Sequence, residues 1–298
     1  MKALFARGGG LAPEVAARAR EPLLVALDFD GTLAPIVGDR DRAEMRARTA
    51  ALLAELAAAC PIAIVSGRSR ADVAARVRGA PVRFVVGNHG VEPGPVAVLR
   101  RCAREAARAR DLLVRALAGR PGIDVEDKGA SLSIHFRHAP DKAAARRAIG
   151  RALAALPVAV RQVAGKDVVN VVPAGAPDKG DAVERLARAA RARAVLYVGD
   201  DVTDEDVFAR ADGHRLIGVR VGRAARSRAG WYLRDQREID QLLAALAALR
   251  TTGASGRPRA SGDRPRAAAP RAARAGRRGR GDGRTRGSSR SRRRRRRP

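Results

Sequence analysis

Cysteine is scarce in this chain, and the few cysteines present are not arranged for cross-linking. Only Cys60 and Cys102 occur among 298 residues, and they form no C-x-x-C or cysteine–histidine spacing. A disulfide framework and a zinc site are therefore not indicated, and a reducing compartment, the cytoplasm, is expected. A chain of this length can bury enough apolar surface to fold without such cross-links.

Long apolar runs are also missing. No stretch approaches the roughly 18 apolar residues of a membrane span. The first 20 residues, MKALFARGGGLAPEVAARAR, contain no apolar run of signal-peptide length. The sequence therefore predicts a protein that is neither exported nor inserted in a membrane.

Acidic residues are too few to balance the basic ones, and the formal net charge is +29. Much of this excess lies in residues 251–298, which hold 18 arginines against two aspartates and include six consecutive arginines, Arg292–Arg297. Such a segment has almost nothing apolar to bury, so a disordered tail is predicted. We expect it to bind polyanions only non-specifically. The oligomeric state is not predicted, and a monomer is the default.

Aromatic residues make up only 3% of the chain, and residues 22–250 lack the aromatic-laced basic surface of nucleic-acid-binding domains. Specific nucleic-acid binding is therefore not predicted. A polyanion-associated protein that acts through its basic tail is the alternative to an enzyme.

Short apolar runs alternate with helical patterns along most of the chain. Such runs, separated by helices and punctuated by glycine, predict a parallel sheet covered on both faces. The runs are LLVAL at 23–27, IAIV at 62–65, FVV at 84–86, VLYV at 195–198 and LIGV at 216–219.

The rhythm changes between Pro93 and Pro173 to an α+β pattern, which indicates a second domain inserted into the first. Its expected elements are a helix around 104–118, a strand pair near 123–137, a helix over 141–156 and a strand pair ending at 172. The predicted division is a core domain in two parts, 1–93 and 174–250, an inserted cap domain over 94–173, and the tail over 251–298.

The segment LLVALDFDGTLAPI carries the strongest chemical signal. An apolar strand leads directly into Asp28 and Asp30, whose side chains project the same way from extended backbone. Gly31 permits a sharp turn that we expect to leave backbone N–H groups free for an anion. Two adjacent carboxylates need a cation, and Mg²⁺ meets that need. An Asx-type turn or a calcium loop is the alternative, but an EF-hand requires a further acidic position and a preceding helix.

A second acidic cluster, GDDVTDED, also follows an apolar strand. Thr203 and Asp206 have the spacing of a capping box, which would explain part of the cluster structurally. Capping does not require Asp200 and Asp201, so Asp200 is predicted to be a metal ligand opposite Asp28.

Two further residues complete the set. Ser66 follows the strand IAIV and is placed to hold a phosphoryl oxygen, although a helix N-cap is the simpler role for a lone serine. Lys179, in PDKG, would by itself be taken for a surface lysine. Its position before the second acidic motif favours a role at the site instead.

In this order, the four motifs resemble the haloacid dehalogenase superfamily of phosphatases. More specifically, six segments are similar to the trehalose-6-phosphate phosphatase family: DFDGTLAPI, IVSGRSR, GNHGVE, EDKGASLSIHFR, PDKG and GDDVTDED. The resemblance spans about residues 22–250. It implies an α/β fold with a Rossmann-like parallel-sheet core and an inserted α+β cap, and a trehalose-phosphatase activity. Hydrolysis of another sugar phosphate remains the alternative.

The resemblance also implies a mechanism. Asp28 attacks phosphorus to give an aspartyl-phosphate, Asp30 serves as acid and then base, and Ser66 and Lys179 hold phosphoryl oxygens. Gly31 and Thr32 join Asp28 and Asp30 in binding the substrate phosphate. The Mg²⁺ ligands are expected to be Asp28, Asp30 through its backbone carbonyl, and Asp200, supported by Asp201 and Asp204.

Sugar contacts follow from the same resemblance. The core loops are expected to contribute Arg68, Asn88, His89 and Glu92, and the cap Glu126, Lys128, His135 and Arg137. An ordinary solvated strand face is the alternative for the cap residues, since polar residues recur there at every second position. The chain departs from the family at Asn170 and Val172, where an acidic and a basic residue are usual, and this departure bears on which sugar phosphate is bound.

Overall fold

The computed structural model describes residues 1–6, 8–165 and 167–254. Seven parallel strands form a central sheet, the core sheet, in the order β1-β11-β10-β9-β2-β3-β4. Their bounds are β1 (Lys2–Ala3), β2 (Leu23–Leu27), β3 (Ile62–Val65), β4 (Phe84–Val86), β9 (Ala194–Gly199), β10 (Leu216–Val221) and β11 (Trp231–Leu233). All five strands expected from the apolar runs are confirmed.

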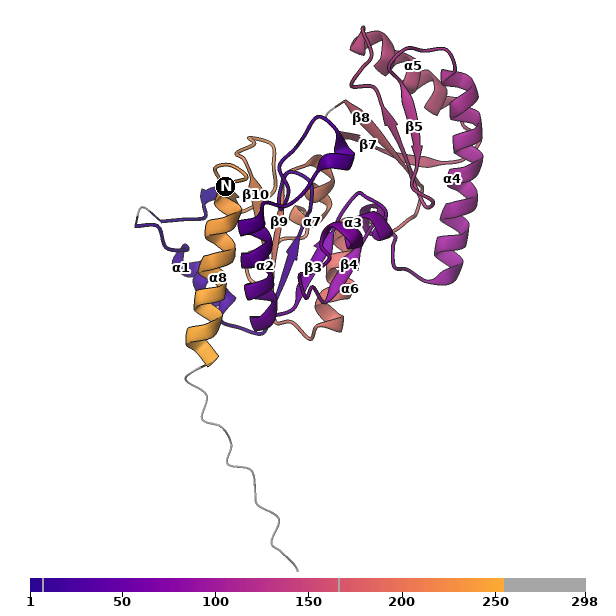
Figure 1. Cartoon of the computed structure of the whole chain (residues 1–298). Helices are drawn as coiled ribbons and strands as arrows, with labels where there is room; N and C mark the ends of the chain where they lie inside the picture. Colours follow the sequence, from indigo (N-terminus) through magenta and orange to yellow (C-terminus); the bar gives the residue numbers. More distant parts are fainter. Residues whose placement is uncertain (7, 166, 255–298) are drawn as a thin grey trace, which may run out of the picture. The chain divides into compact units, whose positions relative to one another are not determined.

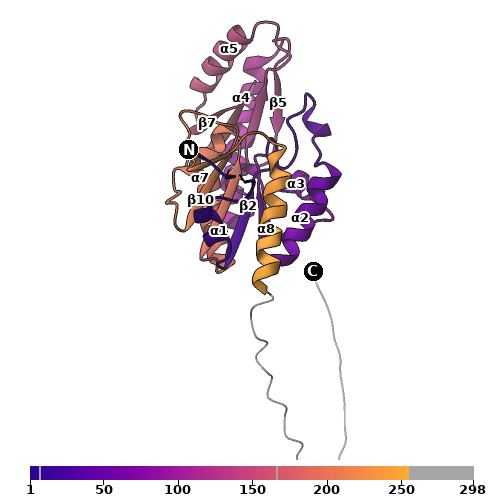
Figure 2. The ribbon, with the colours of Figure 1, turned by 90° about the vertical axis from the view of Figure 1, so that its left-hand side faces the viewer.

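Helices cover both faces of the core sheet because successive residues of its strands point to opposite sides. Leu23, Val25 and Leu27 pack toward one layer, and Leu24 and Ala26 toward the other. The first layer contains α1 (Pro13–Ala19), α2 (Ala47–Ala59) and α8 (Glu238–Ala254), with α3 (Arg70–Arg76) contributing Val73; the second contains α6 (Lys179–Ala189) and α7 (Glu205–Phe208). Figures 1 and 2 show α8 alongside α2.

A second, antiparallel sheet, the cap sheet, has the strand order β5-β6-β8-β7. Its strands are β5 (Asp124–Asp127), β6 (Leu132–His135), β7 (Val160–Gly165) and β8 (Val168–Pro173). The helices α4 (Val96–Leu117) and α5 (Lys142–Ala154) pack against one face through a separate apolar cluster (Figure 1). The expected fold class is thus confirmed, whereas the exact domain limits at 93–94 and 173–174 stay a prediction.

Two short strands and the end of the last helix are not predicted from the apolar runs. Strands β1 and β11 are only two and three residues long, and β1 joins the sheet edge by pairing with β11. Helix α8 continues to Ala254, four residues into the segment expected to be a tail. The remainder of that predicted disordered tail, 255–298, lies outside the described residues.

Cys60 and Cys102 are buried, unpaired thiols, as expected from their spacing. None of the described helices has the length and apolarity needed to cross a membrane.

Candidate active site

The candidate site is built where β2 ends. All five residues of β2 are fully buried, and the backbone N–H of Asp28 continues the ladder by donating to the Val198 carbonyl at 2.9 Å. The Asp28 side chain is 7% exposed. Gly31 then turns the chain with a φ of 82°, and a Cβ at this position would lie 2.1 Å from the Asp200 carboxylate. Only glycine therefore allows the two acidic motifs to come together.

The turn uses two of its own backbone donors. The N–H of Gly31 donates to the Ala34 carbonyl and the N–H of Thr32 to the Phe29 carbonyl. The expectation that backbone N–H groups are left free for an anion does not hold for these two groups, and for Phe29 and Asp30 it stays a prediction. The hydroxyl of Thr32 is buried without a hydrogen-bond partner among the described residues. A buried hydroxyl of this kind is a candidate donor to a ligand oxygen.

Lys179 begins helix α6 and is 1% exposed, so it is not a surface lysine. Its Nζ donates to Asp28 Oδ1 at 2.9 Å and to Asp204 Oδ1 at 2.7 Å. Burial acts to lower the pKa of Lys179, but the carboxylates of Asp204 and Asp28 outweigh it and raise that pKa above its ordinary value. The ammonium is therefore a permanent charge beside Asp28.

Asp28, Asp200 and Asp204 form a cluster in which one carboxylate oxygen from each lies within 4.8 Å of the others. Asp204 is held from three sides, because its oxygens accept from Lys179, from the Tyr197 hydroxyl at 2.6 Å and from the Asp201 backbone. Asp200 Oδ1, in contrast, is buried and has no hydrogen-bond partner among the described residues. The cluster thus holds a buried carboxylate oxygen to which no described group donates.

The capping in this motif differs from the sequence prediction. Asp201 and Asp204 form the capping box of the short 3-10 helix η3 (Val202–Asp204), and Asp206 instead accepts from Arg161 of β7 at 2.9 Å. The expected pairing of Thr203 with Asp206 is therefore wrong. The sequence favours both spacings, and the turn directly after β9 selects the earlier one.

The pKa values of Asp28 and Asp200 are raised by burial and by the carboxylates around them. Burial, opposed by Lys179 and reinforced by neighbouring carboxylates, raises the pKa of Asp28 well above its usual range. Burial together with Asp204 and Asp201 raises the pKa of Asp200 to about 7. Both effects express the cost of placing several negative charges together out of water.

A hard divalent cation fits this arrangement. The donors are carboxylate oxygens, one of them buried and unpaired, and a positive charge between Asp28 and Asp200 would offset the repulsion that raises both pKa values. These features match the oxygen ligands that Mg²⁺ prefers.

The SGR segment lies beside this cluster. Ser66 is fully buried at the end of β3 and accepts the Arg68 N–H at 3.1 Å, while the N-cap of α3 is Ser69. The capping alternative for Ser66 is therefore wrong. Arg68 grips Asp30 with two hydrogen bonds of 2.7 Å each, one from Nε and one from Nη2. Its Nη1 also donates to Asp72 at 2.8 Å.

The cap sheet brings polar groups to the same place. Lys128 Nζ donates to the Gly67 carbonyl at 3.0 Å, and His135 Nε2 lies 2.9 Å from Glu126 Oε2. The Lys128 side chain is only 10% exposed and that of Glu126 23%, so these residues do not form an ordinary solvated face. Burial lowers the pKa of Lys128 to about 8, despite the opposing charge of Glu126.

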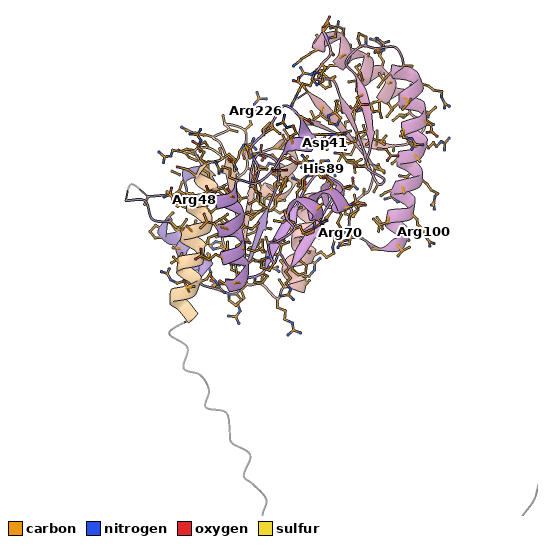
Figure 3. All side chains as sticks on the ribbon, in the orientation of Figure 1. Asp41, Arg48, Arg70, His89, Arg100 and Arg226 are labelled. Carbon is orange, nitrogen blue, oxygen red and sulfur yellow. The ribbon has the colours of Figure 1, made fainter. Side chains whose placement is uncertain are left out.

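The loop after β4 supplies Asn88 and His89, both in the left-handed region with φ of 49° and 56°. The side-chain amide of Asn88 is hydrogen-bonded to the cap: it donates to the Lys128 carbonyl at 2.9 Å and accepts from the Ser131 hydroxyl. His89 (labelled in Figure 3) is buried against Gly67, and neither ring nitrogen has a hydrogen-bond partner within the described residues. Burial and the charges of Lys128 and Lys179 lower its pKa well below the ordinary value, so the ring is neutral.

Glu92 and Arg137, two predicted sugar contacts, bind protein groups in this structure, and their role toward a sugar stays a prediction. Glu92 accepts the backbone N–H of Arg70 at the start of α3 at 2.8 Å. Arg137 donates to the carbonyl of Val37 at 3.1 Å and to that of Gly38. Both residues stabilise loops near the site, and no described bond joins either of them to another predicted site residue.

Sequence reasoning missed two residues. Tyr197 reads as one more buried residue of β9, yet its hydroxyl anchors Asp204; the only hint is a hydroxyl in an aliphatic strand. Arg40, in the loop after β2, pairs with Glu126, and its Nη1 lies 2.7 Å from His135 Nε2. Nothing local marks Arg40, because its partners lie about ninety residues further along the chain.

Comparison with known proteins places these features in a family context. Residues 26–234 match the family model described as trehalose-phosphatase. A trehalose-phosphate phosphatase of Mycobacterium avium is 38% identical over 215 residues, which cover 66% of this chain and 53% of the relative. One of Mycobacterium tuberculosis is 36% identical over 214 residues, covering 64% and 51%. The chain thus spans about half the length of the curated relatives it matches.

Solved structures share the fold. The C-terminal domain of the Candida albicans trehalose-6-phosphate phosphatase superposes with a TM-score of 0.69 at 23% identity, over 80% of this chain and 98% of that domain. The Aspergillus fumigatus trehalose-6-phosphate phosphatase gives a TM-score of 0.54 at 23% identity, over 85% and 100%. At this level of identity the likeness concerns the fold.

Proposed function

Because the chain belongs to the trehalose-phosphatase family, we propose that it is a phosphoric monoester hydrolase that converts trehalose 6-phosphate to trehalose and phosphate. The observation that carries the proposal is the buried contact of Asp28 with Lys179. Beside it lie Asp200 Oδ1 and the Thr32 hydroxyl, neither of which has a hydrogen-bond partner in the described part of the chain. Together these groups offer a nucleophile and several partners for phosphoryl oxygens.

Asp28 is the proposed nucleophile. One of its carboxylate oxygens forms a bond to phosphorus while the bond from phosphorus to the sugar oxygen breaks, and the leaving sugar oxygen takes a proton from Asp30. Water then attacks the aspartyl-phosphate, Asp30 accepts a proton from it, and phosphate leaves Asp28. Arg68 orients the Asp30 carboxylate through two hydrogen bonds before the substrate binds. One of these bonds has to open for an Asp30 oxygen to carry the proton that the leaving group takes.

The remaining groups would bind the phosphate oxygens and offset their negative charge. Lys179, the Thr32 hydroxyl and the Ser66 hydroxyl are the proposed partners of its non-bridging oxygens. Asp28, Asp200 and the backbone carbonyl of Asp30 would hold Mg²⁺, which neutralises the repulsion between carboxylate and phosphate when it is bound. Asp201 and Asp204 support this set, since their capping box and the contacts from Lys179 and Tyr197 fix the turn.

A phosphate-release screen across sugar phosphates, with and without EDTA, tests the proposal. We expect release from trehalose 6-phosphate to exceed release from glucose 6-phosphate, to stop in EDTA and to return with Mg²⁺. Release from neither compound in the presence of Mg²⁺ would overturn the activity. A preference for another sugar phosphate would leave only the phosphatase assignment.

Magnesium is also expected to raise the melting temperature, because it binds the folded state and offsets the repulsion at Asp28 and Asp200. Binding at a hundred times the dissociation constant stabilises a protein by about 2.7 kcal/mol. A thermal melt with EDTA or Mg²⁺ measures this. Asp200→Asn should lose most of the increase, whereas Asp111→Asn, a change at an exposed residue of α4, should keep it. The proposed ligand set is wrong if both variants respond alike.

Affinity for the disaccharide should fall as pH rises past about 8. The pKa of Lys128 is lowered to about 8 by burial, so its ammonium is present below this pH and lost above it. We therefore expect KM for trehalose 6-phosphate to rise between pH 7 and pH 9. Lys128→Arg keeps the charge throughout this range and should remove the alkaline rise. An identical rise in this variant would place the titrating group elsewhere.

A further inference from the structure

Arg40 connects two parts of the site that are far apart in the sequence. It stands on the 3-10 turn η1 (Arg40–Arg42), whose next residue, Asp41, is labelled in Figure 3. Its guanidinium pairs with Glu126, and its Nη1 lies 2.7 Å from His135 Nε2. Both partners come from the cap sheet, whereas Arg40 belongs to the loop that follows the nucleophile strand.

The backbone carbonyl of Arg40 contacts the core side of the site, at Arg68. It accepts from Arg68 Nη2 at 2.7 Å, and the same nitrogen donates to Asp30 Oδ1. One residue thus joins the cap carboxylate Glu126 to the guanidinium that grips Asp30.

Arg76 holds the end of the same turn, η1, through the carbonyls of Asp41 and Ala43. The guanidinium contacts of Arg40 in the cap are a second restraint on the turn, so their loss is expected to loosen the contact between the Arg40 carbonyl and Arg68.

The exposure and charge of the side chains favour a role for the Arg40–Glu126 ion pair in fixing this part of the site. The Asp30 side chain is 40% exposed and that of Arg40 is also 40% exposed, so neither is fixed by burial. Glu126 is largely covered, and its carboxylate contacts His135 at 2.9 Å and Lys128 at 4.0 Å besides Arg40. A charged hydrogen bond to a shielded carboxylate is among the stronger polar contacts in a protein.

We propose that Arg40 is a positioning residue that couples the seating of the cap sheet to the alignment of Asp30. Its guanidinium holds Glu126 and His135, and its carbonyl holds Arg68 against Asp30. The inference rests on the proposed function, because it assigns a purpose to the alignment of an acid–base residue. It adds a determinant of turnover from a residue that touches neither the phosphate cluster nor the nucleophile.

Kinetics of Arg40→Ala and Arg40→Lys on trehalose 6-phosphate and on p-nitrophenyl phosphate test the proposal. We expect the alanine variant to lower kcat/KM on the disaccharide by about 10- to 100-fold, the size of effect that misplaced groups produce. The loss should be at least about tenfold larger than on the small ester, and lysine should restore part of it. Arg42→Ala is the matched control, since Arg42 is exposed on the same turn and makes no side-chain bond to any described residue.

A double variant adds a second criterion. If Arg40 acts through Glu126, then Arg40→Ala should cost much less in a Glu126→Ala background than in the parent. Costs that multiply in full would overturn the link, and so would equal losses in the Arg40→Ala and Arg42→Ala variants. An equal loss on both esters would indicate a merely structural role.

Hydrogen–deuterium exchange provides a readout that needs no turnover. Arg40→Ala should raise exchange at residues 36–43 and 124–135 while leaving β2 and β9 unchanged. Unaltered exchange in both segments would overturn the coupling whatever the enzyme hydrolyses. Absence of phosphate release by the parent from either ester would instead overturn the proposed function, and the exchange result would still decide whether Arg40 holds the cap sheet.

Discussion

Asp28→Asn is expected to lower phosphate release by at least about a thousandfold, the scale of loss when a nucleophile is removed, while the fold persists. An amide neither attacks phosphorus nor serves well as a Mg²⁺ ligand. The Lys179 ammonium retains its 2.7 Å contact with Asp204, so the buried charge keeps a partner. The measurement is steady-state phosphate release, checked against deamidation of the new asparagine back to aspartate.

The same variant should be at least as stable as the parent in EDTA. Burial raises the pKa of Asp28 well above its ordinary value, and the neighbouring carboxylates of Asp204, Asp200 and Asp30 add to this effect. A neutral amide avoids that cost, as expected where function has been favoured over stability. A melting temperature well below that of the parent would show that the carboxylate is structural.

Asp30→Asn is the informative partner of this variant. It keeps the nucleophile but lacks the proton donor and base, so a loss of about 10² to 10⁴ is expected. With p-nitrophenyl phosphate, whose leaving group needs little protonation, a burst of p-nitrophenol followed by slow turnover should appear.

For the Asp28→Asn variant, more than a trace of turnover would contradict the nucleophile assignment.

The parts of the site that sequence predicts well are the ends of strands. Asp28 and Asp200 each follow a run of apolar residues, and the carboxyl ends of neighbouring parallel strands lie at one edge. Their meeting therefore follows from the strand pattern alone. The helix start at Lys179 is equally local, because Asp178 and Asp181 form a capping box around it.

Contacts between the core loops and the cap sheet do not follow from any local pattern. Arg40 meets His135 and Arg137 meets Gly38 across more than ninety residues. The guanidinium of Arg137, which the motif indicates as a sugar ligand, donates to loop carbonyls. Asn88 likewise supports the cap turn through Lys128 and Ser131. Side chains of one chemical type can support a loop or bind a ligand, and no local sequence pattern distinguishes the two roles.

The two departures from the family pattern differ in consequence. Val172 is fully buried in an apolar cluster with Val91, Cys102 and Ala130. Asn170 lies beside polar groups, accepting from Ser133 at 2.6 Å and from Lys128 at 3.5 Å. An amide in place of an acid leaves Lys128 with less negative charge nearby. The departure at Asn170 is thus the one that faces the cap residues proposed to bind sugar.

Glu126→Gln and Lys128→Met are expected to lower kcat/KM on trehalose 6-phosphate by about a hundredfold or more, and far less on p-nitrophenyl phosphate. The phosphate is held by groups at the strand ends, so discrimination between a disaccharide and a small ester requires groups that reach the second ring. Glu126 and Lys128 project from the cap sheet toward the SGR loop, and Lys128 already contacts Gly67 at 3.0 Å. Binding energy from such remote groups can be used to seat the cap, so kcat should fall together with affinity.

Asp124→Asn provides the matched control, because Asp124 lies two residues before Glu126 on β5 and is exposed. It should leave the ratio of the two activities unchanged, within the roughly twofold effect usual for surface substitutions. Equal losses on both esters in the Glu126 and Lys128 variants would assign these residues to the fold or to the chemistry. If the parent shows no preference for the disaccharide and Asn170→Asp creates one, the amide at this position would mark a different natural sugar phosphate. A preference already present in the parent, lost in Glu126→Gln and kept in Asp124→Asn, would locate recognition of the second ring in the cap sheet.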